Sequence, residues 1–398
     1  MNLSRAPLFI LISLSFLFLN DLAYCQKGKI TGKIISANDS LAVPYVGINV
    51  ISQPTGAITN AEGRFILSCS PQDTVLISHL NYESRKIALA SLNTEGYTIS
   101  IVPKVYLLDE VAIQTESIAE MLKKSISTSR EGLGIPMRLE TYYREFVKVD
   151  NHYTKFSDGL LHYDLLGNTS KSKSKVCVLQ SRAKEIPREA DTEMDWDLTS
   201  PLDVGKALNP FLFEKLEQVT EDADKFNFQI LSRLANTDKD QLEIRYSPKP
   251  DIQEALYQGI VVIDKSTKYI LSFSCELDQD PLKPGKEKNF ILLKGKITQY
   301  SLTTLYQLSG TNYQPWYTGL RIGLRLWNNK KFDHTLLFMS DLAVNKLVGP
   351  PFELITNKAA YNKKALYSLG NNYKFDFWKD QNTIQLTGEE EKIIEQLQ

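Results

Sequence analysis

The sequence lacks the residue patterns from which common catalytic sites are built. None of its four histidines has a glutamate three residues later, so the His-x-x-Glu pair of zinc carboxypeptidases is absent. It also has no Gly-x-Ser-x-Gly elbow, no Walker A loop and no dinucleotide-binding glycine fingerprint. We therefore predict no catalytic residue, no cofactor and no metal ligand, and the protein is more consistent with a non-enzyme.

Excess charge is absent as well, and cysteine is scarce. The 46 lysines and arginines balance 47 aspartates and glutamates, which leaves no basic surface for nucleic acid, and we predict no nucleic-acid partner. Of the four cysteines, Cys69, Cys177 and Cys275 lie beyond the N-terminal segment. An odd number of cysteines cannot all pair with one another, so a single disulfide among these three is left open.

One long apolar run is present, near the N-terminus. Arg5 precedes an apolar stretch from Pro7 to Leu19, and residues 1–25 end at Cys25. This pattern predicts a secretory signal peptide, because the run is short for a transmembrane span. We expect export to the periplasm or to the periphery of the outer membrane. Lipidation of Cys25 is the alternative, but the bulky Tyr24 before it favours simple cleavage.

Residues 26–114 consist of short alternating segments separated by turn residues. In the run Thr59–Phe65, Asn60 can form an Asx-turn and Gly63 can adopt a positive φ, so a tight turn followed by a strand is expected. Further strands are predicted at residues 29–35, 46–51, 74–78, 85–89 and 97–102. Strands at this spacing indicate a β-sandwich.

The order of these motifs resembles the carboxypeptidase-regulatory-like domain, a transthyretin-like Greek-key sandwich common in exported proteins of Bacteroidetes-type bacteria. The stretches that carry the resemblance are ITGKIISANDSLAVPYVGINV, GAITNAEGRFIL, VLISHLNYESRKIAL and LLDEVAI, within residues 28–114. The family usually has an aspartate where Asn60 stands and a glycine where Asn81 stands. The resemblance implies a docking or stabilising module and not the peptidase itself.

A helix is predicted after this module. Ile118, Met121, Leu122 and Ile126 form an apolar stripe at helical spacing, and the glycines and proline of residues 132–136 end it. We predict that residues 115–136 are a helical linker and that a second domain spans residues 137–398.

The sequence of the second domain predicts about ten antiparallel strands. A hairpin is expected to turn at Asp150-Asn151. A helix is expected from Leu202 to Val219, and the pair Thr387 and Glu390 predicts a capping box for a terminal helix. The fold class is therefore mainly β: an N-terminal Greek-key β-sandwich followed by a larger antiparallel β domain with a few short helices.

The hairpin YQGIVVIDKSTKYILSFSCEL resembles the strand-turn-strand of the outer-membrane lipoprotein-carrier superfamily. Those proteins curl an antiparallel sheet into a half-barrel whose concave face holds a helix and acyl chains. The resemblance implies an apolar ligand. The aromatic side chains of the first hairpin are candidates to line its groove, although aromatics are equally expected in any strand packed in a core. These candidates are Tyr142, Phe146, Tyr153, Phe156 and Tyr163.

Charged residues elsewhere favour solvent-exposed surfaces. Acidic residues recur at every second position over residues 191–197, and lysines alternate with serines over residues 171–175, so both runs are predicted to be solvated loops. Arg321 and Arg325 alternate with apolar residues, which predicts that one face of that strand is wet, that is, exposed to solvent. His152 and His162 have no metal-ligand spacing around them.

Two hypotheses of function follow. The first is an exported, non-enzymatic envelope protein with an accessory or binding role, whose second domain binds an apolar ligand or another envelope protein, with peripheral membrane association as one mode. The second is a hydrolase of unrecognised type acting on envelope glycan or peptide, which would need two carboxylates facing one cleft.

Overall fold

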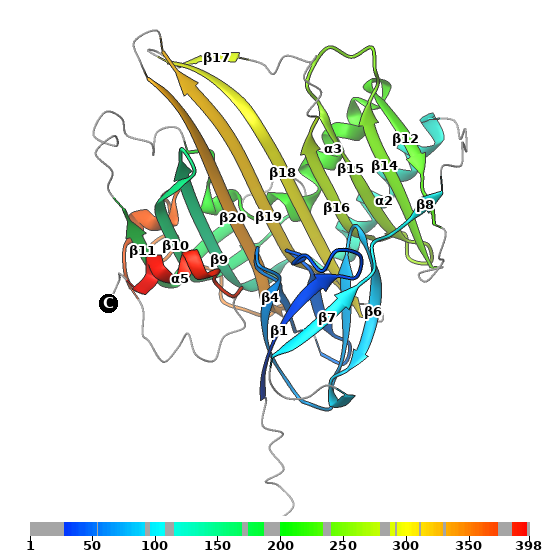
Figure 1. Ribbon diagram of the computed structural model, residues 1–398, viewed down its shortest axis with the longest axis horizontal. Helices are drawn as coiled ribbons and strands as arrows, with labels where there is room; N and C mark the ends of the chain where they lie inside the picture. The colour runs from blue at the N-terminus through cyan, green and yellow to red at the C-terminus, as the bar shows by residue number, and fades with distance from the viewer. Residues whose placement is uncertain are drawn as a thin grey trace, which may run out of the picture.

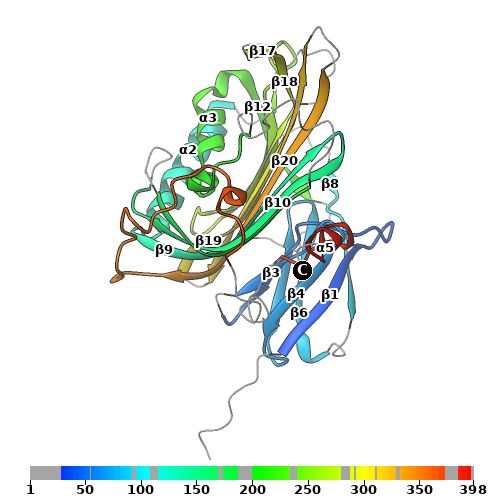
Figure 2. The same ribbon diagram turned by 90° about the vertical axis from the view of Figure 1, so that its left-hand side faces the viewer.

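The protein is described here from a computed structural model. The structure describes residues 28–53, 55–91, 96–107, 115–168, 174–186, 200–233, 240–278, 287–290, 293–309, 312–328, 332–372 and 384–395. The predicted signal peptide, the acidic run of residues 191–197, and Lys171 and Lys173 lie outside these ranges. A small β-sandwich packs against the outer face of a large curled sheet (Figures 1 and 2).

The N-terminal module is a sandwich of two short sheets. One sheet has the order β4 (Arg64–Cys69), β1 (Gly28–Ser36), β7 (Tyr97–Ile101), and the other has the order β3 (Gly56–Ile58), β2 (Gly47–Val50), β5 (Thr74–His79), β6 (Tyr82–Ala88). A 3-10 turn, η2 (Leu89–Ser91), follows β6. Inward-facing aliphatic residues such as Ile34, Val75 and Leu67 form one buried core between the sheets. The predicted sandwich is confirmed.

The turn before β4 also forms as the sequence predicts. Asn60 Oδ1 accepts hydrogen bonds from the backbone N–H groups of Glu62 and Arg64, both at 2.9 Å. Gly63 has a φ of +72°, and a Cβ atom there would lie 2.5 Å from the carbonyl oxygen of Ile34. A larger residue at position 63 would therefore be strained both by its backbone conformation and by contact with β1.

The second domain is built on one open antiparallel sheet. Its order is β11 (Ser174–Glu185), β10 (His152–Leu165), β9 (Met137–Val149), β20 (Asp333–Val348), β19 (Asn312–Trp327), β18 (Leu293–Ser309), β16 (Ile270–Leu277), β15 (Tyr257–Asp264), β14 (Gln241–Pro248) and β12 (Phe226–Ile230). The short strand β17 (Glu287–Phe290) also pairs with β18, and β8 (Tyr106–Leu107) pairs with β13 (Ser232–Arg233). The ten-strand path confirms the predicted antiparallel domain.

Helical segments cover the concave face of this sheet (Figure 2). They are α2 (Thr115–Gly132), η5 (Val204–Lys206), η6 (Asn209–Leu212), α3 (Glu214–Glu221) and η7 (Ala223–Lys225), with η8 (Leu366–Leu369) near β10 and β11. Ile118, Leu122 and Ile126 of α2 are buried in the same core as the sheet residues Tyr163, Phe273 and Leu342. The sheet thus forms a half-barrel whose interior is largely filled by helix and aromatic side chains.

The helix expected from Leu202 to Val219 is a wrong prediction. The chain instead forms the turns η5 and η6, and only Glu214–Glu221 is α-helical. Pro210 lies at the start of η6, and Phe213 adopts a left-handed conformation with a φ of +61°, which interrupts a continuous helix. The hydrophobic spacing of this segment does not distinguish one continuous helix from two turns followed by a short helix.

The C-terminal helix α5 (Gly388–Glu395) has the predicted capping box. The backbone N–H of Thr387 donates to Glu390 Oε2 at 2.8 Å, and the N–H of Glu390 donates to Thr387 Oγ1 at 3.2 Å. This helix lies on the convex face of the large sheet, beside the sandwich (Figure 2). No helix in the described part of the chain is both long and apolar enough to cross a membrane.

Candidate functional site

The five aromatic residues predicted to line a groove are divided between the two faces of the sheet. Phe146, Tyr153 and Phe156 form one cluster on the convex face, with ring centroids of Phe146 and Phe156 5.0 Å apart, and Ile393 of α5 packs against this cluster. Tyr142 lies on the same face, nearer the sandwich. Tyr163 faces the concave side and donates a hydrogen bond to the carbonyl of Val204. These residues therefore do not line a common groove.

A pocket of about 270 Å³ lies on the concave face, between the turns η5 and η6 and the strands β18, β19 and β20. Its lining includes Tyr143, Leu202, Pro210, Leu302, Leu320, Leu342 and Thr318 together with a charged rim. We call this the concave pocket. It is a hollow on the helix-covered side of the half-barrel.

The floor of the concave pocket is set by strand register. Leu302 of β18 pairs directly with Leu320 of β19, and Thr318 pairs with Leu342 of β20. Directly paired residues of an antiparallel sheet point to the same face, so three leucine side chains meet on the concave side. Leu302 and Leu342 are each 1% exposed, whereas Leu320 is half-buried and faces the pocket.

The roof of the pocket is held by hydrogen bonds to the turn backbone. Asp203 accepts from the N–H of Gly205 at 3.0 Å and so caps η5. Tyr306 donates to the carbonyl of Phe211 at 3.0 Å. Arg130 of α2 donates to the carbonyl of Leu212 at 2.7 Å and pairs with Glu217 at 2.8 Å. The turns are therefore tied to both the sheet and α2.

Lysine side chains dominate the rim. Lys206, Lys215 and Lys364 line the mouth with the carboxylates of Asp203 and Glu214. Lys206 pairs with Asp203 at 3.5 Å while its side chain stays 72% exposed. Lys215 Nζ lies 5.2 Å from the ring centroid of Tyr257, a cation–π contact at the pocket edge.

Apolar surface continues from the pocket along the long strands. A second buried cluster on the concave face contains Val147, Leu336 and Phe338, and Leu320 and Leu324 pack against it while remaining half-buried. Ile297 pairs with Leu324 and is 39% exposed. The concave face therefore offers a partly exposed apolar track beyond the pocket itself.

The convex face holds a buried charge network instead of the predicted wet surface. Arg144 and Arg321 each donate to Asp341 at 2.8 Å, and Tyr317 donates to the same carboxylate at 2.6 Å. Arg321 also donates to the hydroxyl of Tyr45 in the sandwich at 2.8 Å. The prediction that Arg321 lies on a wet face is wrong because the sandwich covers it.

Opposing effects act on the pKa of Asp341 in this network. Burial alone would raise the pKa of the carboxyl, but the two guanidinium groups of Arg321 and Arg144 hold the pKa at about 2.

Arg325 lies four residues after Arg321 on β19, on the same face of the strand. It pairs with Asp333 on the surface, and both side chains are 52% exposed. On the convex face of β19, the position of Arg325 is therefore open to solvent, whereas that of Arg321 is covered.

Two further contacts join the sandwich to the large sheet. Lys104 pairs with Glu243 at 2.8 Å, with side chains only 3% and 2% exposed, and Tyr106 donates to the same carboxylate at 2.7 Å. Asn60 Nδ2 donates to the carbonyl of Leu386 at 3.0 Å, directly before α5. The turn at Asn60 thus has a second role, since it also anchors the C-terminal segment.

No disulfide joins any two of the three described cysteines. Cys69 and Cys275 are buried and Cys177 is partly buried. Burial raises the pKa of Cys275 to about 12, so its thiol stays protonated and unreactive. Among the residues that the structure describes, no group of three His, Cys, Asp or Glu side chains is arranged to hold a metal ion.

Residues 30–113 match the family described as the CarboxypepD_reg-like domain, which agrees with the sandwich. A search of curated proteins found no match. Solved structures that match include a LolA superfamily protein from Nitrosomonas europaea, 8% identical over 58% of this chain and 94% of that chain, with a TM-score of 0.23. Lipovitellin matches at 8% identity over 58% of this chain and 28% of that chain, with a TM-score of 0.25. We assign the open half-barrel from the order and pairing of its own strands.

The leucines of the concave pocket are not among the residues that sequence reasoning selected. Leu320 and Leu324 do show the period-two alternation of a strand, and that signal identifies one apolar face. It does not identify the neighbours of that face. Leu302 and Leu342 come beside Leu320 only through the pairing of three long strands.

Proposed function

We propose that this protein is an exported, non-enzymatic accessory protein of the cell envelope that binds an apolar chain, such as a fatty acyl group, in the concave pocket. The observation that carries the proposal is the leucine floor of Leu302, Leu320 and Leu342 beneath a fixed roof. The half-buried Leu324 and the exposed Ile297 lie beyond the pocket on the same face and extend its apolar surface.

The energetics favour a chain over a compact apolar molecule. Each methylene removed from water contributes about 0.8 kcal/mol, so affinity should rise with chain length while further methylenes still find apolar surface. A pocket with further apolar surface beyond it suits a long flexible chain. The lysines at the rim, Lys206, Lys215 and Lys364, provide cations for an acidic head group such as a carboxylate.

The position of the sandwich supports an accessory role for that domain. It packs against the convex face, through Tyr45 and Lys104, and does not contribute to the concave face, where the helical segments and the pocket lie (Figure 2). Export is supported by the signal-like pattern of residues 1–25. The hydrolase hypothesis has no comparable support, since the buried carboxylates of Glu145, Asp158 and Asp341 are hydrogen-bonded within the sheet.

Titration of the purified protein with saturated fatty acids of increasing length tests the proposal. We expect binding of one chain per protein, with affinity that rises with length. Leu320→Glu places a carboxylate in the half-buried floor and should weaken binding at least tenfold, at a cost of more than about 1.4 kcal/mol for the desolvated charge. Leu354→Glu is the matched control, because Leu354 is 52% exposed and does not line the pocket. Equal affinities of the two variants would refute the pocket assignment.

A further inference from the structure

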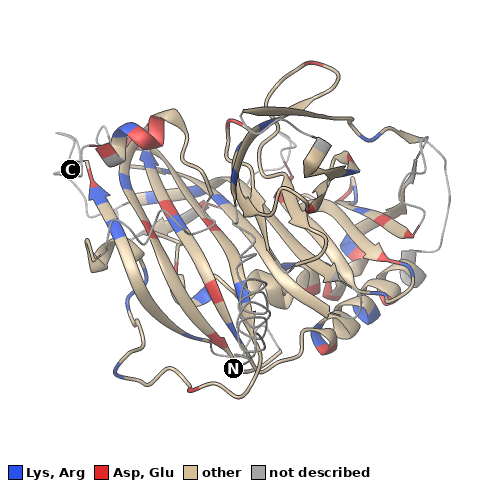
Figure 3. Ribbon diagram, turned by 90° about the horizontal axis from the view of Figure 1, so that it is seen from below, with Lys and Arg blue, Asp and Glu red and all other residues tan. Residues whose placement is uncertain are grey.

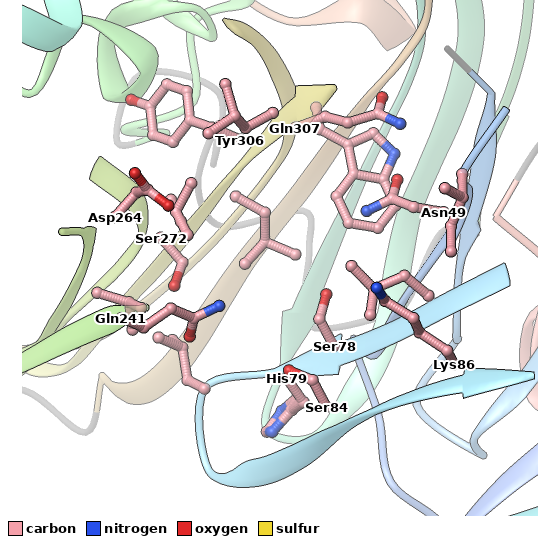
Figure 4. Close-up of a pocket in the computed structure, with 18 of the residues that line it drawn as sticks. Asn49, Ser78, His79, Ser84, Lys86, Gln241, Asp264, Ser272, Tyr306 and Gln307 are labelled. Carbon is pink, nitrogen blue, oxygen red and sulfur yellow. The ribbon is translucent and has the colours of Figure 1, made fainter. Parts of the chain in front are cut away.

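A second hollow, separate from the concave pocket, lies between the sandwich and the convex face of the large sheet. Its volume is about 360 Å³, and strands β2, β5 and β6 form one wall while β14, β15, β16 and β18 form the other. Figure 4 shows Asn49 on one side of this space and Gln241, Asp264 and Ser272 on the other. We call it the interdomain cleft.

One buried polar atom in the cleft has no partner. Asn49 is 7% exposed, and its Oδ1 is the only buried side-chain nitrogen or oxygen, within the described ranges, that lacks a hydrogen bond. An unpaired buried acceptor costs free energy, and native structures rarely keep one without a reason. Asn49 lines the cleft, and a small rotation of its amide toward the cleft would bring the buried Oδ1 within reach of an O–H or N–H donor on a bound molecule.

The remaining polar groups of the cleft are mostly hydroxyls and amides. Ser78, Ser84, Ser272, Gln241 and Gln307 line it from both domains. Serine hydroxyls and carboxamides each both donate and accept hydrogen bonds, so they match a ligand whose own groups do both. Hydroxyl groups on a ring have this property. The lining therefore favours a polyhydroxylated ligand over an apolar one.

Several charged or titratable groups around the cleft already have partners or are neutral. Lys104 is paired with Glu243 at 2.8 Å. Asp264 Oδ1 accepts hydrogen bonds from the hydroxyls of Ser266 and Thr267 at 2.6 and 2.9 Å. His79 is kept neutral near pH 7, because burial and the nearby Lys104 lower its pKa to about 4. Of the described residues that line the cleft, Lys86 is the one exposed lysine. These features favour an uncharged ligand.

Apolar side chains complete the lining. Leu305 is 6% exposed, Val262 is 4% exposed and Trp316 is 4% exposed, and all three border the cleft. A sugar ring combines apolar C–H groups with a rim of hydroxyls, so it can contact both kinds of lining. The volume is at the low end of the range for small-molecule sites, which suits a single ring.

We propose that the interdomain cleft binds one neutral sugar ring, with a ligand hydroxyl donating to Asn49 Oδ1. This site is independent of the acyl-chain pocket, because the two lie on opposite faces of the sheet. A sugar bound there contacts both the sandwich and the large sheet, so it would also hold the two domains together.

Calorimetric titration of the full-length mature protein with glucose, galactose, mannose and N-acetylglucosamine tests this proposal, with glucuronate and glucosamine as charged probes. We expect at least one neutral sugar to bind with 1:1 stoichiometry and both charged probes to bind more weakly. Asn49→Leu should weaken the binding about tenfold, the effect of losing one buried hydrogen bond. Gln241→Leu, in the opposite wall, should also weaken it.

The controls separate binding from folding and from the concave pocket. Asn49→Leu removes an unsatisfied acceptor, so its melting temperature should be unchanged or higher. Asn227→Leu makes the same change at an exposed position away from the cleft and should bind normally. Leu320→Glu should also keep its sugar affinity. Absence of binding by every neutral sugar at millimolar concentration, or undiminished affinity in both Asn49→Leu and Gln241→Leu, would overturn the proposal.

Discussion

The Cη2 atom of Trp316 lies 2.2 Å from the position that a Cβ atom at Gly47 would occupy. The indole ring of β19 therefore fills space that is available only because β2 of the sandwich carries a glycine there. A Cβ at Gly56 would also lie 3.1 Å from the same ring, and Trp316 is 4% exposed. Aromatic insertion into a glycine-lined surface thus joins the two domains, next to the charge network around Asp341.

Gly47→Ala should push the Trp316 ring out of its position. Overpacking of a tight contact costs about 1–3 kcal/mol, so we expect that loss in the free energy of unfolding measured by urea denaturation. Gly28→Ala is the matched control, since a Cβ there meets nothing within 4 Å. If the two variants are equally stable, the ring does not depend on the glycine.

Asp341 is the shared acceptor of the charge network, so its removal should lower the free energy of unfolding. Asp341→Asn leaves Arg144 and Arg321 buried without their shared counter-charge, for which about 3–5 kcal/mol of destabilisation is expected. Asp333→Asn breaks a surface pair with Arg325 and should cost about 1 kcal/mol or less. Denaturant unfolding of both variants checks the contrast, and similar losses in both would contradict it.

The same carboxylate predicts the behaviour of the protein in acid. The pKa of Asp341 in the folded state, about 2, lies below its ordinary value of 3.8, so the folded state binds fewer protons between these limits. Stability should therefore decrease as the pH falls from about 4 to 2, by on the order of 2 kcal/mol from this group. Thermal unfolding across this range, in the parent and in Asp341→Asn, measures the contribution by difference.

The pKa of His79 predicts a second pH range in which the protein loses stability. Its folded pKa of about 4 lies below the ordinary 6.5, because burial and Lys104 disfavour the protonated ring. The unfolded chain binds the proton first, so stability should fall as the pH decreases from 6.5 to 4. An NMR titration of the ring protons reads the pKa directly. A midpoint near 6.5 would show that the ring is not desolvated at the domain interface.

Asn60 connects the sandwich turn to the C-terminal segment through its amide nitrogen. Asn60→Asp keeps the oxygen that accepts from Glu62 and Arg64, but it replaces the donor to the carbonyl of Leu386 by an acceptor. We expect the sandwich to remain folded while α5 is released, which hydrogen exchange of residues 384–395 would report. The carboxypeptidase-regulatory-like family usually has an aspartate at this position, and that residue could not donate to the carbonyl of Leu386 here. Unchanged protection of α5 would contradict this account.

Much of the fold can be predicted from local sequence signals. The Asx-turn at Asn60, the hairpin at Asp150-Asn151 and the capping box of Thr387 each depend on a few adjacent residues, and each is found in the structure. Period-two alternation also marks both faces of strands such as β19. These features need no knowledge of distant contacts.

The site could not be predicted in the same way, because alternation does not tell which face of a strand becomes concave. Tyr142 and Phe146 occupy one face of β9 and Tyr143 the other, and only the placement of α2 and the sandwich decides their roles. A register shift between Tyr153 and Lys155 further changes the face that Tyr153 occupies. Leu302, Leu320 and Leu342 meet only through long-range pairing.

The central claim is that an acyl chain occupies the concave pocket, and a crystal structure of the protein soaked with a terminally brominated fatty acid tests it most directly. Anomalous scattering locates the bromine without ambiguity. Our account predicts bromine density on the concave face, along the surface from Leu302 and Leu342 to Leu324. Bromine only on the convex face or in the interdomain cleft, or no bromine at saturating ligand, would contradict it.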